Sequence, residues 1–269
     1  MSRRHAVIGH GRLARALVPA LRAVGEPVVV GRRSPGDGEL GPADAARAAD
    51  WVWLTVPDDH IAATAAALPW RDGQLALHCS GATPLSALAT APAAAGFHPL
   101  KLLVGDAGLT GVHVGIEAAD GHRRALHTLA VALGLQPLAL PSPMSASARA
   151  AYHAAANLAA SGMLAVLADA QALWVTAGLA PADALAALAP LTRGALDTAL
   201  AHGLAGAVSG PIARGDAGVL RRHLDALTAA GLEADLLLAL ARRQLALAEQ
   251  AGRLSAAQIT ALRECLRRA

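Results

Sequence analysis

Short apolar runs and amphipathic helical patterns alternate through the first half of the chain. The apolar runs are typical of strands buried on both faces of a sheet, and the segments between them repeat apolar residues at helical spacing. Strands are predicted at residues 5–8, 27–30, 51–56, 75–78, 96–98, 113–117 and 137–140, with helices beginning near Leu13 and at residues 58–68, 84–89 and 121–133. This alternation predicts a parallel, doubly wound sheet with helices on both faces.

Strand patterns stop at Pro141, Ser142 and Pro143, and only helical patterns follow. Helices are predicted at residues 145–177, 181–202, 216–230, 234–250 and 255–268. The predicted fold class is therefore α/β, with an N-terminal Rossmann-type domain over residues 1–143 and an all-helical C-terminal domain over residues 144–269.

The run from residue 150 to residue 168 is uncharged and long enough to be tested as a membrane span. It contains Tyr152, His153, Asn157 and Ser161 and has no excess of basic residues on one flank, so we interpret it as a buried helix and expect no membrane partner. The run has more apolar surface than a small helical domain buries by itself. It therefore predicts a homodimer formed through that domain.

Composition excludes several classes of protein. The 269 residues are 54% hydrophobic, and the net charge of +3 comes from scattered arginines with Lys101 as the single lysine. One Tyr and one Phe provide no stacking surface for bases, so we expect no nucleic-acid partner. Cys79 and Cys265 match no metal or redox spacing, which predicts no metal site and suits a reducing cytoplasm. The N-terminal residues enter the first strand directly and leave no apolar core for a signal peptide.

A glycine-rich turn joins the first strand to the first helix. Gly9, Gly11 and Ala14 form the pattern G-x-G-x-x-A, in which the first glycine makes a tight turn, the second admits a pyrophosphate and the small third residue allows close packing. The alternative is a glycine turn without a ligand. The candidate cofactor-binding residues here are Gly9, His10, Gly11, Arg12, Leu13 and Ala14.

The end of the second predicted strand indicates which dinucleotide is bound. Where NAD-binding proteins offer a carboxylate to the ribose, this chain has Arg32, Arg33 and Ser34. Guanidinium groups are planar forks of donors that suit a 2′-phosphate, so these residues favour NADPH, a form of NADP, as the cofactor. The alternative is that both arginines are solvated loop charges.

Two loops at the carboxyl ends of later strands complete the candidate cofactor site. Val56, Pro57 and Asp58 follow the third strand, where Asp58 either contacts the cofactor or only caps the next helix. Ser80 and Gly81 follow the fourth strand. Ser80 is a candidate for both cofactor and substrate binding, and a plain turn serine is the alternative.

Candidate substrate-binding and catalytic residues lie further along the chain. His98 and Lys101 bring an imidazole and the single ammonium close together after the fifth strand, with a structural histidine as the alternative for His98. His153 and Asn157 are one turn apart on one helix face, which offers a proton donor and an amide that orients a carbonyl. A satisfied core histidine is the alternative for His153.

Arg214 lies in a turn between two helices of the C-terminal half. It is a candidate anion anchor for a small-molecule substrate. The alternative is that it only pairs with Asp216 or caps a helix.

Several segments together resemble a family of Rossmann-like proteins that carry a C-terminal helical domain of unassigned function, domain of unknown function 2520. They are Gly-His-Gly-Arg-Leu-Ala, Val-Pro-Asp, His-Cys-Ser-Gly, Phe-His-Pro-Leu, Tyr-His-Ala-Ala-Ala and Gly-Pro-Ile-Ala-Arg-Gly-Asp. The resemblance covers nearly the whole chain. It implies a relationship to ketopantoate reductase, pyrroline-5-carboxylate reductase, prephenate dehydrogenase and the beta-hydroxyacid dehydrogenases, with a nicotinamide cofactor, a C-terminal domain like that of 6-phosphogluconate dehydrogenase and often a dimer built on that domain.

The sequence departs from these relatives at one position. Beta-hydroxyacid dehydrogenases and ketopantoate reductases place a catalytic lysine on a helix of the second domain, and here a similar spacing holds His153 and Asn157. Either imidazole replaces ammonium as the acid, or the substrate differs, or catalysis is lost. Lys101 is a candidate to anchor a substrate carboxylate or to stand in for the missing catalytic ammonium. The hypothesis is an NADPH-dependent reductase of a small 2-oxo acid or related carbonyl, ketopantoate-like first. The alternatives are a cyclic-imine reductase and a non-catalytic dinucleotide sensor.

Overall fold

The structure is a computed structural model that describes residues 3–104 and 108–268. It consists of two compact units that divide after Ala160. Sequence analysis placed the boundary after residue 143, before helix α5 (Ala146–Asn157). Instead α5 belongs to the first unit, because its side chains Arg149 and Tyr152 bond to strands of the sheet.

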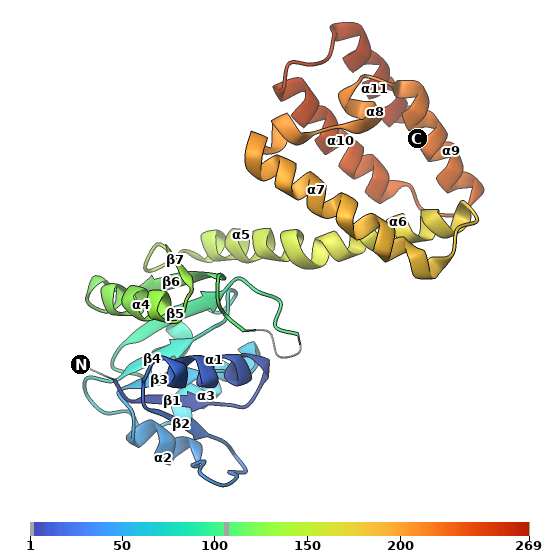
Figure 1. Ribbon diagram of the computed structural model, residues 1–269. Coiled ribbons are helices and arrows are strands. Elements are labelled where there is room, and N and C mark those ends of the chain that lie inside the picture. The colour runs from blue at the N-terminus through green and yellow to red at the C-terminus, as the bar shows by residue number, and fades with distance from the viewer. Residues whose placement is uncertain (1–2, 105–107, 269) are drawn as a thin grey trace. The chain divides into compact units, whose positions relative to one another are not determined.

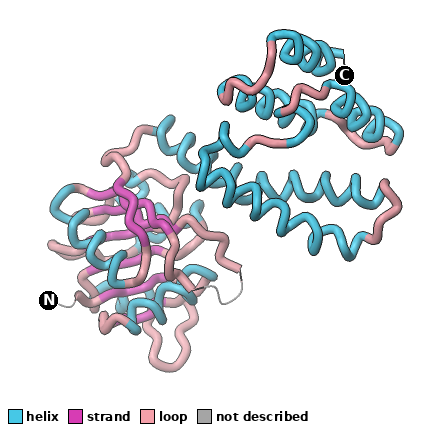
Figure 2. Tube along the Cα trace, turned by 45° about the horizontal axis from the view of Figure 1, so that its top comes forward, coloured by secondary structure: helices cyan, strands magenta, loops and turns pink. Residues whose placement is uncertain are grey.

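Seven strands form a single sheet in the first unit, in the order β2-β1-β3-β4-β5-β6-β7 (Figures 1 and 2). Their bounds are β1 (His5–Ile8), β2 (Val28–Gly31), β3 (Trp51–Leu54), β4 (Leu75–His78), β5 (Ala94–Pro99), β6 (His113–Ala118) and β7 (Gln136–Ala139). The predicted fold class, a Rossmann-type sheet followed by a helical region, is confirmed.

One pair of strands departs from the predicted parallel arrangement. β6 runs antiparallel to β5, with Gly96 opposite Glu117 and His98 opposite Gly115. A parallel return normally needs a crossover of a dozen or more residues, usually a helix. Residues 100–104 and 108–112 contain no helix, so the chain turns back beside β5 instead.

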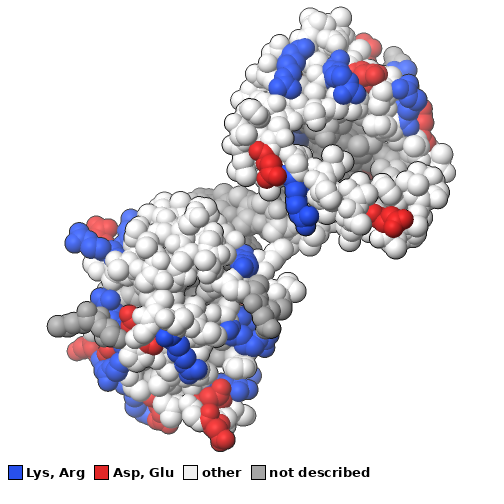
Figure 3. All heavy atoms as spheres, viewed as in Figure 1, with Lys and Arg blue, Asp and Glu red and all other residues white. Residues whose placement is uncertain are grey.

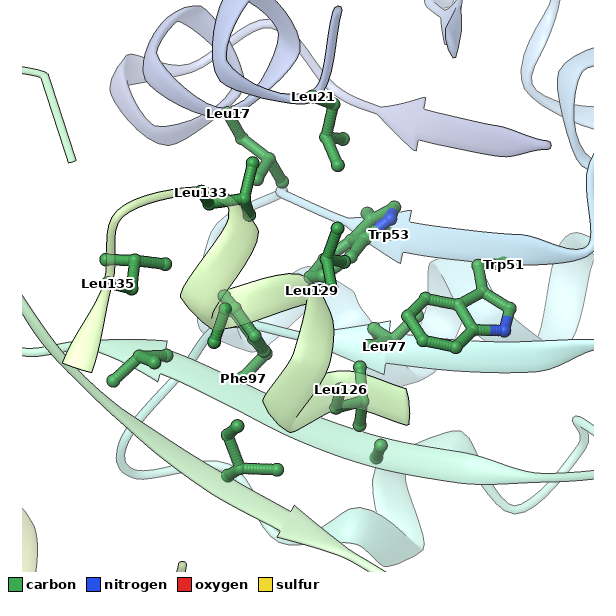
Figure 4. Packing of buried hydrophobic residues seen from close by; sticks show 14 of the residues in the cluster. Leu17, Leu21, Trp51, Trp53, Leu77, Phe97, Leu126, Leu129, Leu133 and Leu135 are labelled. Carbon is green, nitrogen blue, oxygen red and sulfur yellow. The ribbon is translucent and has the colours of Figure 1, made fainter. Parts of the chain in front are cut away.

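Helices cover both faces of the sheet because successive strand residues point to opposite sides. On one face, Leu17 of α1 and Leu126 of α4 pack on Trp53, Leu77 and Phe97 of the strands (Figure 4). On the other face, buried residues of α2 and α3 pack on the alternate strand positions. The helices are α1 (Arg12–Ala23), α2 (Pro42–Arg47), α3 (Ile61–Ala67) and α4 (Asp120–Ala132), with short 3-10 helices at Asp58–His60 and Leu85–Leu88.

In the second unit, every secondary-structure element that the structure describes is a helix. Its core gathers Ile212, Leu220, Leu224, Leu245 and Leu262 from four of the helices. The helices are α6 (Met163–Thr176), α7 (Pro181–Ala207, interrupted at Gly203), α8 (Gly210–Ala213), α9 (Ala217–Ala229), α10 (Asp235–Gln250) and α11 (Ala256–Arg268). A π-helical turn at Leu158–Gly162 lies where the two units divide.

The sequence predicts a buried helix over residues 150–168. The single chain forms the helix but does not bury it, so the prediction of burial is wrong. The helical stretch Ala146–Thr176 has a mean hydropathy of 1.5 over its most apolar window, and none of that window is buried. By length and composition this one helix could cross a membrane. Apolar side chains near its centre are exposed, as with Leu158 at 70% exposure and Leu164 at 58%.

Candidate active site

The turn between β1 and α1 has the geometry that its glycines predict. Gly9 has φ 118°, and a Cβ there would lie 2.9 Å from the carbonyl oxygen of Thr55. A Cβ on Gly11 would lie 3.7 Å from the same oxygen, which is an ordinary contact. The fold therefore requires a glycine at position 9 and tolerates a side chain at position 11. In the G-x-G-x-x-A pattern this second glycine is the position that admits a pyrophosphate.

A cavity of about 750 Å³ surrounds this turn. The predicted cofactor-binding residues that line it are Gly9, His10, Gly11, Arg32, Arg33, Ser34, Val56 and Pro57. The other predicted residues do not line it: Arg12, Leu13 and Ala14 lie in α1, Asp58 begins a 3-10 helix, and Ser80 and Gly81 lie in the loop after β4. Thr55, Pro42 and Thr64 also line the cavity, and sequence analysis did not select them. The glycine turn and the arginines are thus brought to one cavity.

Arg32 has a partner that sequence analysis missed. Its Nη1 donates to both carboxylate oxygens of Glu39, at 3.0 and 3.3 Å, and the backbone N–H of Gly36 also donates to Glu39. The Gly36 N–H and Arg32 hold the pKa of Glu39 below its usual range. A carboxylate therefore stands beside the predicted phosphate-binding arginines, seven residues beyond Arg32, although the sequence offers none at the strand end itself. A bridge between Gly31 and Leu40 closes the loop and brings Glu39 back.

Asp58 and Ser80 meet across the ends of two neighbouring strands. Ser80 Oγ donates to the Asp58 carboxylate at 2.6 Å and accepts from the backbone N–H groups of Ala82 and Thr83. No side-chain cap is made at the start of the 3-10 helix or of α3, so Asp58 does not act as a helix cap. Ser80 is a turn serine that also fixes the Asp58 carboxylate.

α5 places two of the three predicted catalytic residues at a second cavity. The helix begins at Ser145, whose side chain accepts from the Ala148 N–H and caps it. His153 and Asn157 line a cavity of about 680 Å³, and Arg149 lines it one turn earlier on the same helix. The side chains of His153 and Asn157 are exposed, so His153 is not the satisfied core histidine that was the alternative.

Beneath this cavity lies a buried polar cluster that sequence analysis missed. Glu117 and Arg149 form an ion pair at 2.5 Å with side chains only 2% and 7% exposed, and Glu117 also accepts from the Met144 N–H at 2.8 Å. His78 is fully buried beside them, and burial, with the Arg149 charge as a second cause, lowers its pKa to about 4. His78 is therefore neutral at physiological pH. Glycine at position 96 lies between His78 and Glu117 in the sheet register.

His98 is joined to Tyr152 of α5. Its Nδ1 lies 2.9 Å from the Tyr152 hydroxyl, and the rings meet edge to face. Burial lowers the pKa of His98, and the charge of His153 lowers it further. Glycines make room for both rings, since a Cβ on Gly81 would lie 2.6 Å from His98 and one on Gly115 would lie 2.5 Å from the Tyr152 hydroxyl.

The remaining two candidates lie elsewhere. Lys101 donates to the backbone carbonyl of Gly108 and does not line either large cavity. Arg214 is exposed in the second unit, where its carbonyl accepts from Gln258 at 2.9 Å. Within the described residues, no group of three His, Cys, Asp or Glu side chains is arranged to hold a metal. On the face shown in Figure 3, charged residues of both signs are interspersed on each unit.

Comparison with known proteins gives a family match and several structural likenesses. The family model described as Domain of unknown function (DUF2520) matches residues 112–256, which is more than half of the chain. Among curated proteins, none matches the sequence. A crystal structure of a Thermotoga maritima protein is similar at a TM-score of 0.71 and 20% identity, covering 93% of this chain and 100% of that one.

Two similar structures carry descriptions of activity. An imine reductase from Pseudomonas sp. has a TM-score of 0.67 at 19% identity and covers 99% of this chain and 100% of its own. A reductive aminase from Aspergillus terreus, in complex with NADPH and ethyl levulinate, has a TM-score of 0.66 at 16% identity and covers 98% and 99%. At these identities the likeness establishes a shared fold.

Proposed function

The chain belongs to the DUF2520 family, and we propose that it is an NADPH-dependent oxidoreductase that reduces a small 2-oxo acid or related carbonyl compound. The observation that carries the proposal is that the first unit combines two cavities. One is lined by a glycine turn and two arginines, and the other by His153 and Asn157. The fold shared with a reductive aminase crystallised with NADPH supports the choice of cofactor.

The residues of the first cavity fit the cofactor. The space above Gly11 suits a pyrophosphate at the N-terminus of α1, and Arg32 and Arg33 suit a 2′-phosphate. When bound, NADPH supplies a hydride. Asp58 and Ser80, fixed by their hydrogen bond, present polar atoms at the carboxyl ends of β3 and β4, where ligands of such sheets bind.

His153 and Asn157 supply the remaining chemistry. The oxygen of a carbonyl that is being reduced gains negative charge and must be protonated. His153 would donate that proton, since its exposed imidazole lines the cavity, and Asn157 would hold the oxygen through its amide. Lys101 stays a less favoured proton donor because its ammonium is bonded to Gly108.

Two alternatives follow from the same site. Reduction of a cyclic imine uses the same groups, and the imine reductase of like fold supports it. A non-catalytic sensor would bind the dinucleotide without turnover.

The deciding experiment titrates NADPH into the protein and then follows NADPH absorbance with a panel of 2-oxo acids, ketones and cyclic imines. Turnover of 2-oxo acids supports the proposal, and turnover of imines alone supports the first alternative. Tight NADPH binding without turnover supports the sensor, and no binding of NADPH overturns the proposal.

We also propose a homodimer whose interface includes α6 and α7. Their leucines are 52% to 79% exposed: Leu164, Leu185, Leu191, Leu196, Leu200 and Leu204. Asp169, Asp183, Arg193 and Asp197 lie on the same helices, which disfavours a lipid environment. A second copy of the chain fits such a mixed surface better.

Light scattering tests this assembly. We expect twice the monomer mass at micromolar concentration, a monomer for Leu196→Glu with Leu200→Glu, and no change for Val131→Glu, which adds a charge at an exposed position on α4. A wild-type monomer would rule the dimer out. Recovery of the protein only with lipid vesicles would identify a membrane as the cover instead.

A further inference from the structure

We infer that Arg149, held by Glu117, binds the carboxylate of an anionic substrate at the second cavity. The inference rests on the proposed function and narrows its substrate class to small carboxylates. It assigns the anchoring role to Arg149 in place of Lys101 and Arg214.

The sheet register explains why a charged pair is buried here. His78 and Glu117 stand on either side of Gly96 in one row of the sheet, and a Cβ on Gly96 would lie 3.5 Å from both side chains. The missing side chain leaves a gap in the sheet surface. α5 closes that gap with Arg149.

Glu117 uses both of its oxygens, whereas Arg149 has donors left over. Oε1 of Glu117 accepts from Met144 and Oε2 from Arg149. A guanidinium has five N–H donors, and among the bonds between described residues Arg149 makes one, from Nη2. Its buried Nε has no hydrogen-bond partner among the described residues. Unsatisfied donors on a desolvated cation are costly and call for an acceptor.

In the part of the chain that the structure describes, no neighbouring group supplies that acceptor. Both ring nitrogens of His78 lack hydrogen-bond partners, so neither of them accepts from Arg149. His98 and Tyr152 bond to one another. Arg149 lines the 680 Å³ cavity and another one of only about 10 Å³ beside His78 and Tyr152, so an acceptor as large as a carboxylate must come from the 680 Å³ cavity.

The cavity lining favours a small carboxylate over other anions. Arg149, His153 and Asn157 recur every four residues along one face of α5, and the remaining lining residues are apolar or small. One guanidinium already paired with Glu117 suits a single negative charge better than a phosphate. The fork of donors matches two carboxylate oxygens, and the apolar lining suits a short hydrocarbon chain.

Calorimetric titration with two probes tests this assignment with and without bound NADP. The probes are 2-oxoisovalerate and its neutral counterpart 3-methyl-2-butanone, which has a methyl group in place of the carboxylate. We expect the wild-type protein to bind the carboxylate more tightly. Replacing both partners, Glu117→Gln with Arg149→Gln, leaves no unpaired buried charge and should weaken carboxylate binding about 10- to 100-fold, the range for loss of a charged hydrogen bond.

Two further variants test whether the loss of binding comes from the guanidinium group of Arg149. Arg149→Lys keeps the charge and loses the fork, so it should weaken carboxylate binding less than the double variant while the protein stays folded by circular dichroism. Arg124→Gln removes a charge from an exposed position on α4 and should change nothing.

Equal binding of the two probes to the wild-type protein, or undiminished carboxylate binding in both Arg149 variants, would overturn the inference. Failure to bind any carboxylate, with or without NADP, would also overturn it. Because the titration without cofactor needs no turnover, failure of NADPH binding would end the proposed function while this assay still decides the role of Arg149.

Discussion

The two large cavities of the first unit are similar in volume, but the residues that form them differ in burial and charge. The cavity at the β1–α1 turn is lined by backbone, small residues and the arginines Arg32 and Arg33, the first part-buried and the second exposed. The cavity along α5 rests on a buried ion pair and a neutral buried histidine. Screened charges contribute little and desolvated ones contribute much. Substitutions should therefore have larger effects at the second cavity than at the first.

The largest effect is expected from His153→Ala. If His153 donates the proton, turnover should fall by a factor on the order of 10² to 10⁴ while NADPH affinity stays nearly the same. Steady-state kinetics normalised to folded protein, with His127→Ala on α4 as the exposed control, measure it. Full activity in His153→Ala would refute the assignment and move the donor role to Lys101 or His98.

The buried His78 should make the second cavity sensitive to acid. The pKa of His78 is about 4 in the folded protein and 6.5 when exposed. The contribution of neutral, buried His78 to stability is therefore fully present above pH 6.5 and is lost as the pH falls toward 4. The unfolded chain takes up the proton first across that window. A shift of this size corresponds to about 3 kcal/mol in the free energy of unfolding.

Urea denaturation between pH 7 and pH 4 measures this loss. We expect His78→Asn to reduce the dependence on pH, because no buried imidazole is left to resist protonation. His127→Asn, an exposed change on α4, should keep the wild-type dependence. His5 also has a pKa lowered by burial. Because His5 is present in the wild type and in both variants, it does not account for a difference between their curves. Identical curves for His78→Asn and the wild type would contradict the expectation.

At the first cavity, the expected effects are smaller. Arg32→Ala with Arg33→Ala should weaken NADPH binding about 10- to 100-fold and change NADH binding little, because only NADPH has a 2′-phosphate for the guanidinium groups. Fluorescence titration of both cofactors measures this. Arg22→Ala with Arg124→Ala removes the same charge at exposed positions and serves as the control. Equal affinity of the wild-type protein for both cofactors would remove the basis for the NADPH preference.

The same contrast explains which residues sequence analysis found. Contiguous residues form the first cavity's turn and strand end, so Gly9, Gly11 and Arg32 stood out as a motif. The ion pair of Glu117 with Arg149 depends on the register of β4, β5 and β6, and β6 was expected to run parallel. A single glycine at position 96 gives no local signal that two distant side chains approach across it. The helical spacing of His153 and Asn157 was visible because both lie on one element.

The smallest effect is expected at the partly exposed ion pair of the first cavity. Glu39 holds Arg32 through a partly exposed pair, with side chains 17% and 37% exposed, so a 2′-phosphate must compete with a carboxylate already on that guanidinium. Exposed pairs of this kind contribute little, which predicts NADPH binding at most about fivefold tighter in Glu39→Gln. Asp37→Asn makes the same change of charge at an exposed position in the same loop and should have a smaller effect, because among the described residues the Arg32 guanidinium bonds to Glu39 and not to Asp37. Titration of 2′,5′-ADP and 5′-AMP isolates the contribution of the 2′-phosphate, since only the first compound carries it.

Equal effects of the two variants would show that only net charge matters. Weaker 2′,5′-ADP binding in Glu39→Gln would show that Glu39 orients Arg32 for the phosphate instead of competing with it.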